Sequence, residues 1–204
     1  MGDIIVFFVT ALLFIAHLSC DRIDHEPAKE NSSTEPAPDT NALASVKQGN
    51  KWGYIDRTGK YAINPQFEYT VLFSEGLASV KQGNNWGYID RTEKYTIKPQ
   101  FNQAYFFTGG LAPVASKPGD KWGYIDKTGK YAIKPQFDEA YLFTDGLANV
   151  KLGGKWGYIV KTGKYAINPQ FDSAGPFCGG LAIVKVGDKW GYIDKTGKYQ
   201  RSTT

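Results

Sequence analysis

Residues 51–60 read Lys-Trp-Gly-Tyr-Ile-Asp-Arg-Thr-Gly-Lys, and close copies of this stretch begin at residues 85, 121, 155 and 189. All five tryptophans of the 204-residue chain lie in these copies, spaced 34, 36, 34 and 34 residues apart. Such a period is the length of one supersecondary unit, so the sequence predicts a repeat array. The repeated Trp-Gly pairs are Trp52-Gly53, Trp86-Gly87, Trp122-Gly123, Trp156-Gly157 and Trp190-Gly191.

The repeats occupy residues 43–204. Each unit opens with Leu-Ala, and each of the first four closes on a glycine. One two-residue insertion lies near 116–120, in the first turn of its unit, where added residues cost little. The predicted units are therefore 43–76, 77–110, 111–146, 147–180 and a shortened last unit, 181–204.

Each unit begins with the signals of a β-hairpin. In the first unit, short runs at 43–47 and 51–56 flank Gly49-Asn50, which predicts a two-residue turn of type I′ or II′. The other units offer turns of the same chemistry at Gly83-Asn84, Gly119-Asp120, Gly153-Gly154 and Gly187-Asp188.

A second turn follows at 56–59, where Asp56 and Gly59 predict a three-residue hairpin with a bulge. Two units depart from this pattern, since Glu93 replaces the glycine and Val160 replaces the aspartate. We expect Glu93 to adopt the left-handed conformation at a cost of about 1 kcal/mol. A third strand runs into Pro65, which cannot donate to a ladder, so this strand should lie at an edge or end there.

The units carry apolar side chains on both faces of their second strand, with Trp52 and Tyr54 on one face and Ile55 on the other. A sheet of about three short antiparallel strands is marginal alone, so neighbouring units should cover it, with the tryptophans between them. The period is short for a propeller blade. We therefore expect an all-β, open or superhelical array of five units; the alternative is a closed propeller- or barrel-like array.

The motif Lys-Trp-Gly-Tyr-Ile-Asp-x-Thr-Gly-Lys-Tyr-x-Ile-x-Pro-Gln-Phe resembles the WG repeat family, also called the KWG Leptospira repeat, over residues 43–199. The resemblance implies a bacterial surface or secreted protein, in a family of mostly unknown role with no catalytic residues to carry over. The choline-binding cell-wall repeat is a weaker match, because it is shorter and centred on Gly-Trp.

The N-terminal residues 4–18 are nearly all apolar. As a helix they would span about 22 Å, which is short of a hydrocarbon core of about 30 Å. We therefore expect a signal peptide at 1–19, with Cys20 lipidated as in a bacterial lipoprotein. His17 and Leu18 depart from the usual lipobox, although looser signals resembling this one occur in spirochaetal lipoproteins. Plain secretion and an uncleaved anchor are the alternatives.

After Cys20, residues 21–42 hold six acidic and two basic side chains and no aromatic one. Such a segment cannot bury enough surface to order itself, and a coil of this length reaches about 26 Å. Residues 20–42 therefore read as a lipidated cysteine followed by an acidic tether. The expected location is outside the cytoplasm, at the outer membrane or the cell surface, with the membrane as a partner through the lipid.

No constellation for catalysis is evident, since the expected mature chain has one histidine, His25, in the tether. The recurrent aspartates at 56, 90, 126 and 194 sit at a turn position that explains them structurally. With Cys20 lipidated, only Cys178 remains, so no Cys/His metal site is expected. Cys178 should be a buried small hydrophobe, and the alternative is a reactive thiol. We expect no enzyme activity, cofactor or metal.

The repeats carry 22 basic and 13 acidic side chains, a net charge of +9, against −4 for the tether. Stacked units should align two sets of bases, one of them Arg57, Arg91, Lys127, Lys161 and Lys195. The predicted ligand ridge is the other set: Lys60, Lys94, Lys130, Lys164 and Lys198. Such a ridge would bind an anionic polysaccharide or a protein, whereas the alternative is a solvated lysine edge that blocks aggregation. The expected location makes nucleic acid an unlikely partner, and the sequence leaves the oligomeric state open.

Overall fold

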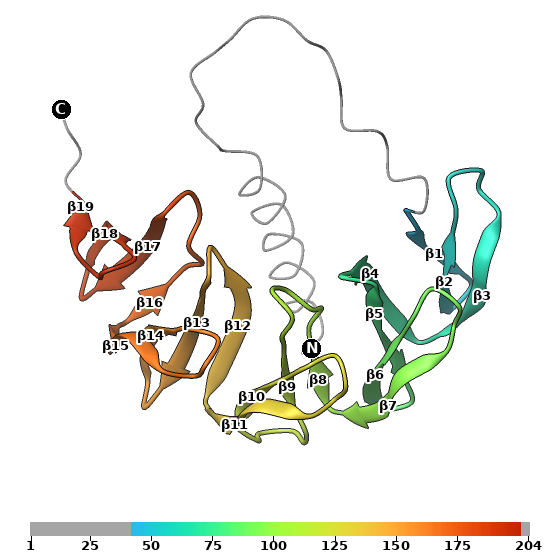
Figure 1. Cartoon of the computed structure of the whole chain (residues 1–204), viewed down its shortest axis with the longest axis horizontal. Coiled ribbons are helices and arrows are strands. Elements are labelled where there is room, and N and C mark those ends of the chain that lie inside the picture. The colour runs from blue at the N-terminus through green and yellow to red at the C-terminus, as the bar shows by residue number, and fades with distance from the viewer. Residues whose placement is uncertain (1–41, 201–204) are drawn as a thin grey trace, which may run out of the picture.

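A computed structural model describes residues 42–200. The predicted signal peptide, Cys20 and nearly all of the tether lie outside the described residues. Within 42–200, no helix has the length and apolar character needed to cross a bilayer. The described chain forms a row of antiparallel sheets bent into an arc, with β1 and β19 at its opposite ends (Figure 1).

The sheets follow one another in chain order, and within each the strands pair in sequence order. The first sheet contains β1 (Ala44–Gln48), β2 (Lys51–Ile55) and β3 (Tyr61–Phe67). The second contains β4 (Tyr69–Ser74), β5 (Leu77–Gln82), β6 (Asn85–Ile89) and β7 (Tyr95–Phe101). The third contains β8 (Gln103–Ala104), β9 (Ala112–Ala115), β10 (Trp122–Ile125) and β11 (Tyr131–Phe137).

The fourth sheet contains β12 (Glu139–Thr144), β13 (Leu147–Leu152), β14 (Lys155–Ile159) and β15 (Tyr165–Phe171). The fifth contains β16 (Ser173–Ala174), β17 (Leu181–Val186), β18 (Lys189–Asp194) and β19 (Tyr199–Gln200). None of the described sheets closes on itself into a barrel. The prediction of an open all-β array is confirmed.

The sheets after the first have four strands, where the sequence suggested about three per unit. The extra strand is the closing segment of a unit, which pairs with the unit that follows. Glu68 alone separates β3 from β4, and β4 then pairs with β5, with Thr70 opposite Val80. Each four-stranded sheet therefore spans the boundary between two sequence units, and every such boundary is tied by backbone hydrogen bonds.

The first hairpin turn has the predicted form in the first unit, where Gln48 pairs with Lys51 and Gly49 has a φ of 58°. The third sheet differs from the prediction, because the turn there is not Gly119-Asp120. Instead, the Asp120 N–H donates to the Lys117 carbonyl oxygen at 3.1 Å, and Gly119 has a φ of 79°. The insertion thus places Pro118 and Gly119 at the centre of the turn, which is the residue pair that a type II turn prefers.

The second turn is held by its aspartate, as the sequence indicates. The Asp56 carboxylate accepts hydrogen bonds from the Thr58 N–H (2.8 Å), the Thr58 hydroxyl (2.7 Å) and the Lys60 N–H (3.1 Å). Where Val160 replaces the aspartate, the backbone still closes the turn, with the Gly163 N–H 2.8 Å from the Val160 carbonyl oxygen. Glu93 takes the left-handed conformation with a φ of 69°, as predicted.

The glycine of each internal Trp-Gly pair faces a bulge in the strand beside it. In the third sheet, Trp122 pairs with Phe137 and Tyr124 with Ile133, so extra residues of β11 lie opposite Gly123. A Cβ at Gly123 would lie 2.7 Å from the Ile133 carbonyl oxygen and 2.8 Å from the nitrogen of Pro135. No side chain fits there, because both neighbours are backbone. The proline-containing strand is the last of its sheet, which confirms the predicted edge position.

The core between successive sheets is centred on a tyrosine rather than on the tryptophan. Tyr124 is 0% exposed, whereas Trp122 is only partly buried and Trp190 is 57% exposed. The expectation that the tryptophans fill the interfaces is therefore wrong for most of them. The reason is their place in the strand: the tryptophan is one of the first residues after the hairpin turn, while the tyrosine two residues later lies beneath the following sheet.

These core tyrosines also tie each sheet to the next. Each hydroxyl donates to a backbone carbonyl oxygen of the neighbouring segment, and burial raises the pKa of all four. The pairs are Tyr54 with Val71 (2.5 Å), Tyr88 with Tyr105 (2.7 Å), Tyr124 with Tyr141 (2.7 Å) and Tyr158 with Gly175 (2.8 Å). The same bond therefore recurs at every internal interface.

Candidate functional site

Four tryptophans form an aromatic seam with tyrosines that lie in, or directly after, the first strands of the sheets. Tyr69 lies between Trp52 and Trp86, with ring centroids 5.5 and 5.7 Å apart. Farther along, Tyr105 stacks on Trp122 with centroids 5.5 Å apart and an interplanar angle of 23°. Lysine ammonium groups lie over three tryptophan rings at 5.6–5.8 Å, in the pairs Lys47–Trp52, Lys151–Trp156 and Lys185–Trp190. These distances are within the range of cation–π attraction, so the lysines and tryptophans stabilise each other's positions.

Three exposed lysines form salt bridges with carboxylates that join neighbouring sheets. Glu68 accepts from the Lys51 ammonium at 2.9 Å and from the Gly83 N–H of the next hairpin turn at 3.1 Å. Asp172 makes the same two contacts with Lys155 (2.5 Å) and the Gly187 N–H (2.6 Å), and Asp138 contacts Lys121 and the Gly153 N–H. The hydrogen bond from the lysine is the main cause that lowers the pKa of each carboxyl.

The set of bases in the second turns contacts the sheet that precedes it. The Lys127 ammonium donates to the Glu75 carbonyl oxygen at 2.8 Å and lies 3.2 Å from its carboxylate. Lys195 lies 3.9 Å from the Asp145 carboxylate, and the end of the Lys161 side chain lies over Gly109. At least these three bases of the second turns therefore contact the preceding sheet and do not project freely into solvent.

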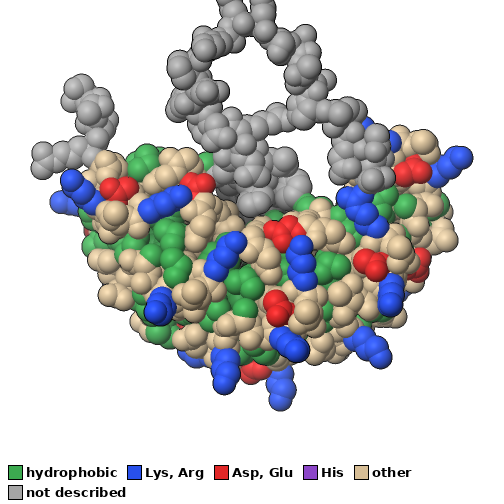
Figure 2. Space-filling model, viewed as in Figure 1, with side chains coloured by type: hydrophobic (Ala, Val, Ile, Leu, Met, Phe, Trp, Pro, Cys, Tyr) green, Lys and Arg blue, Asp and Glu red, His purple; other side chains and the backbone are tan. Residues whose placement is uncertain are grey.

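The five lysines of the predicted ridge, Lys60, Lys94, Lys130, Lys164 and Lys198, are all exposed. Each lies at the same turn of its sheet, directly before the last strand. Among residues 42–200, none of the five forms a salt bridge within 4 Å. In Figure 2 the basic side chains stand singly on the face shown, and several project from the convex edge of the arc.

The turn aspartate reduces the charge around four of these lysines. Asp126, for example, accepts from the Lys130 N–H at 3.1 Å, and its pKa is lowered chiefly by the hydrogen bond from the Thr128 hydroxyl, with a smaller contribution from Lys130. In the fourth unit Val160 takes the place of the aspartate. Lys164 consequently has no turn carboxylate beside it, and this turn is the most positive of the five.

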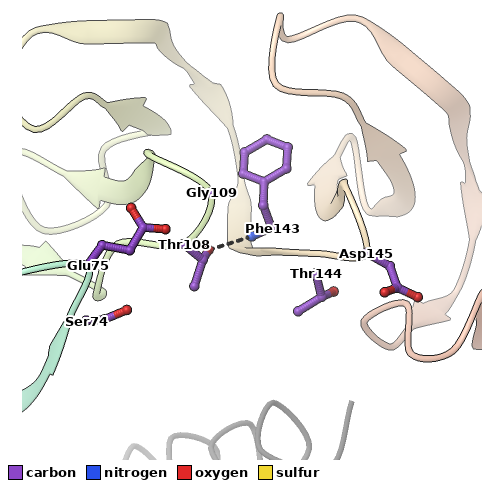
Figure 3. A pocket seen from close by; sticks show the side chains of 7 residues that line it. All are labelled: Ser74, Glu75, Thr108, Gly109, Phe143, Thr144 and Asp145. Atoms are coloured by element: carbon purple, nitrogen blue, oxygen red, sulfur yellow. Dashed lines mark hydrogen bonds between the residues drawn. The ribbon is translucent and has the colours of Figure 1, made fainter. Parts of the chain in front are cut away.

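A shallow pocket of about 360 Å³ lies where turns of the second, third and fourth sheets meet, lined by Ser74, Glu75, Thr108, Gly109, Phe143, Thr144 and Asp145. Figure 3 shows the two carboxylates on opposite sides, with the threonines between them. Both carboxylates are already engaged, since Glu75 accepts from the Gly110 N–H at 3.0 Å and Asp145 from the Gly180 N–H at 2.8 Å. The two carboxylates therefore already have hydrogen-bond partners, whereas the buried Thr144 hydroxyl has none within the described residues.

The sequence did not indicate this pocket. Its one available signal was the acidic residue before Gly76 and Gly146, at a position where the other units have glycine. Glu75 and Asp145 adopt φ values of 51° and 52°, which are uncommon for residues other than glycine. The bonds that their carboxylates make to the neighbouring turns offset this strain.

No metal cluster is found in the described part of the chain. Within 42–200, no three His, Cys, Asp or Glu side chains are grouped to hold a metal ion. Cys178, expected to be buried as a small hydrophobe, is only partly buried. That expectation is therefore wrong.

The chain has similar solved structures at low sequence identity. No curated protein matches it. Similar solved structures include streptogramin B lyase (16% identity, 81% of this chain and 70% of that chain, TM-score 0.46) and virginiamycin B lyase from Staphylococcus aureus (14% identity, 78% and 67%, TM-score 0.47). The computationally designed Ika4 protein is similar at 8% identity, over 60% of this chain and 87% of that chain, with a TM-score of 0.43. These values carry no conclusion about activity.

The sequence profile described as "WG containing repeat" matches residues 52–86, 86–115, 122–156 and 156–190. These matches cover more than half of the chain, and each begins at the tryptophan of one of the Trp-Gly pairs described above. The chain therefore belongs to the family of proteins built from WG-containing repeats.

Proposed function

We propose that this protein is a non-enzymatic, surface-tethered module that binds an anionic polysaccharide through the ridge lysines. The observation that supports this function is the contrast between two groups of lysines. Both groups are exposed, but Lys51, Lys121 and Lys155 each form a salt bridge with a carboxylate, whereas the ridge lysines form none in the described region. Repeated, uncommitted cations suit a repeating anionic ligand.

Binding to a heparin-like matrix tests the role of the ridge. The triple variant Lys94→Gln, Lys130→Gln, Lys164→Gln should elute at a lower salt concentration than the wild type, because multivalent charge contacts are screened by salt. The matched control replaces Lys51, Lys121 and Lys155 by glutamine. Both triple variants lower the formal net charge by the same three units, from +4 to +1.

The control should elute close to the wild type once its fold is confirmed by tryptophan fluorescence. Equal shifts of the two variants would mean that net charge alone drives retention. If the ridge variant elutes at the same salt concentration as the wild type, the ridge lysines only protect the sheet edges from aggregation. That result would favour the second candidate function, a soluble exported or intracellular scaffold for protein–protein association.

The tether is the other part of the proposal, and it depends on Cys20. Metabolic labelling with a fatty acid should mark the wild type and not Cys20→Ala, and the variant should leave the membrane fraction. Because the chain has only two cysteines, a lipid on Cys20 and an intrachain disulfide at Cys178 exclude each other. Mass spectrometry of the purified protein distinguishes them, and an unlabelled Cys20 would overturn the lipid anchor.

A further inference from the structure

The fifth sheet exposes the face that every earlier sheet buries. In the fourth sheet, Tyr158 is 0% exposed and Trp156 is 8% exposed, because the fifth sheet covers them. Their equivalents on β18, Tyr192 and Trp190, are 54% and 57% exposed. Leu181 of β17 is 39% exposed as well. We call this surface of β17 and β18 the trailing face.

The first sheet exposes the opposite face. Its alanine Ala44 is exposed, although the equivalents Ala78, Ala112, Ala148 and Ala182 in the later sheets are 0–2% exposed. Val46 is only partly buried, whereas its equivalents Val80, Val114, Val150 and Val184 are 0% exposed. Tyr61 lies on the same face of the first sheet. Its equivalents Tyr131 and Tyr165 pack edge-on against Phe101 and Phe137 of the preceding sheet. We call this surface of the first sheet the leading face.

The trailing and leading faces are the two halves of one type of interface. Each of the four internal interfaces joins the trailing side of one sheet to the leading side of the next, as the contacts of β2 with β4 and of β3 with β5 show at the first of them. The two free faces of one chain stand at opposite ends of the arc (Figure 1) and do not meet. Among the described residues 42–200, each therefore lacks the partner that the same surface has at the internal interfaces.

We propose that the trailing face of one copy docks on the leading face of a second copy, so that the chain associates head to tail. A contact between two different surfaces is heterologous, and it extends into a longer assembly unless the rotation closes a ring. The internal interfaces indicate what covers the free trailing face. At each of them, a trailing face is covered by the leading face of another WG-repeat sheet. This inference does not depend on the proposed binding to polysaccharide.

The contact between copies should be weaker than the internal ones. Within the described residues, the first sheet has no strand equivalent to β4, whose Val71 carbonyl oxygen accepts the hydrogen bond of Tyr54. The hydroxyl of Tyr192 would therefore dock without that acceptor. The interface would consist mainly of the apolar side chains of the two faces, so the assembly should dissociate on dilution.

Sedimentation of the full chain tests the association. The average mass of the wild type should rise with concentration over about a hundredfold range, as mass action requires. Trp190→Ser with Tyr192→Ser disables the trailing face, and Ala44→Asp with Tyr61→Ser disables the leading face; each double variant alone should stay monomeric. Leu152→Ser, at a residue of the fourth sheet that is 38% exposed, is the control and should associate like the wild type.

Mixing the two double variants gives the sharpest result. Each retains one intact face, so an equimolar mixture should form a heterodimer and nothing larger. If disabling the trailing face abolishes association while disabling the leading face does not, two trailing faces pair with each other and the head-to-tail arrangement is wrong. A wild type that stays monomeric throughout would overturn the inference entirely, and circular dichroism establishes that each variant is folded.

Discussion

Gly123→Ala should lower the free energy of unfolding by about 1–3 kcal/mol, the cost of forcing atoms into a packed site. The added methyl group would meet the Ile133 carbonyl oxygen and the Pro135 nitrogen, both of which belong to the backbone. Neither backbone atom can rotate away from the methyl group as the end of a side chain could. The bulge in β11 would have to open, and the pairing of β10 with β11 would weaken. Urea unfolding followed by tryptophan fluorescence measures the change.

The fifth sheet provides the matched control. At Gly191, the same position of the motif, a Cβ would meet only ring atoms of Tyr199 at 3.0 Å. That ring is 51% exposed and can move into solvent. Gly191→Ala should therefore cost much less than Gly123→Ala. Equal costs at the two sites would show that the general loss of a glycine, and not the backbone contact, explains why glycine follows the tryptophan.

Tyr124→Ala should cost about 3–5 kcal/mol, as is usual when a fully buried aromatic side chain is truncated. Tyr124 packs 5.1 Å from Phe143 between ring centroids, and its hydroxyl donates to the Tyr141 carbonyl oxygen. The substitution removes both contacts and loosens the third sheet from the fourth. Tyr124→Phe, which removes only the hydrogen bond, should cost about 1 kcal/mol.

Two further substitutions test whether burial between sheets causes the loss of stability expected for Tyr124→Ala. Tyr192→Ala, at the equivalent but exposed position, should change the stability of the monomer little. Trp122→Ala should fall between the two, because that ring is only partly buried. A larger loss at Trp122 than at Tyr124 would restore the tryptophan as the main residue of the interface.

The sequence predicted the features that are encoded within a few neighbouring residues. The hairpin turn at Gly49, the aspartate-centred turn at Asp56 and the left-handed Glu93 all depend on local backbone chemistry, and all are present. The fourth strand was missed because its partner lies in the following unit. A short run such as 69–74 shows its apolar pattern, but nothing within the run states which neighbour it pairs with.

The sequence predicted the regular spacing of the ridge lysines. It did not predict which basic side chains form salt bridges with a neighbouring sheet. Equal spacing placed Lys94, Lys130 and Lys164 at one turn of successive sheets, and the structure shows them exposed there. The same spacing could not separate them from Lys127 and Lys195, whose acidic partners lie in the preceding sheet. The difference depends on where two turns meet across a sheet boundary, which a repeat period does not specify.

The hydrogen bonds between sheets also have a consequence for the order of folding. The tyrosine hydroxyls bond to residues 17 positions ahead, and the carboxylates of the turns to glycines 15 or 35 positions away. Contacts this local close small loops, which favours rapid folding, and in repeat proteins they let structure form at one place and spread. The first interface can therefore form on a growing polypeptide as soon as the second sheet has emerged, while the C-terminal sheets are still to be synthesised.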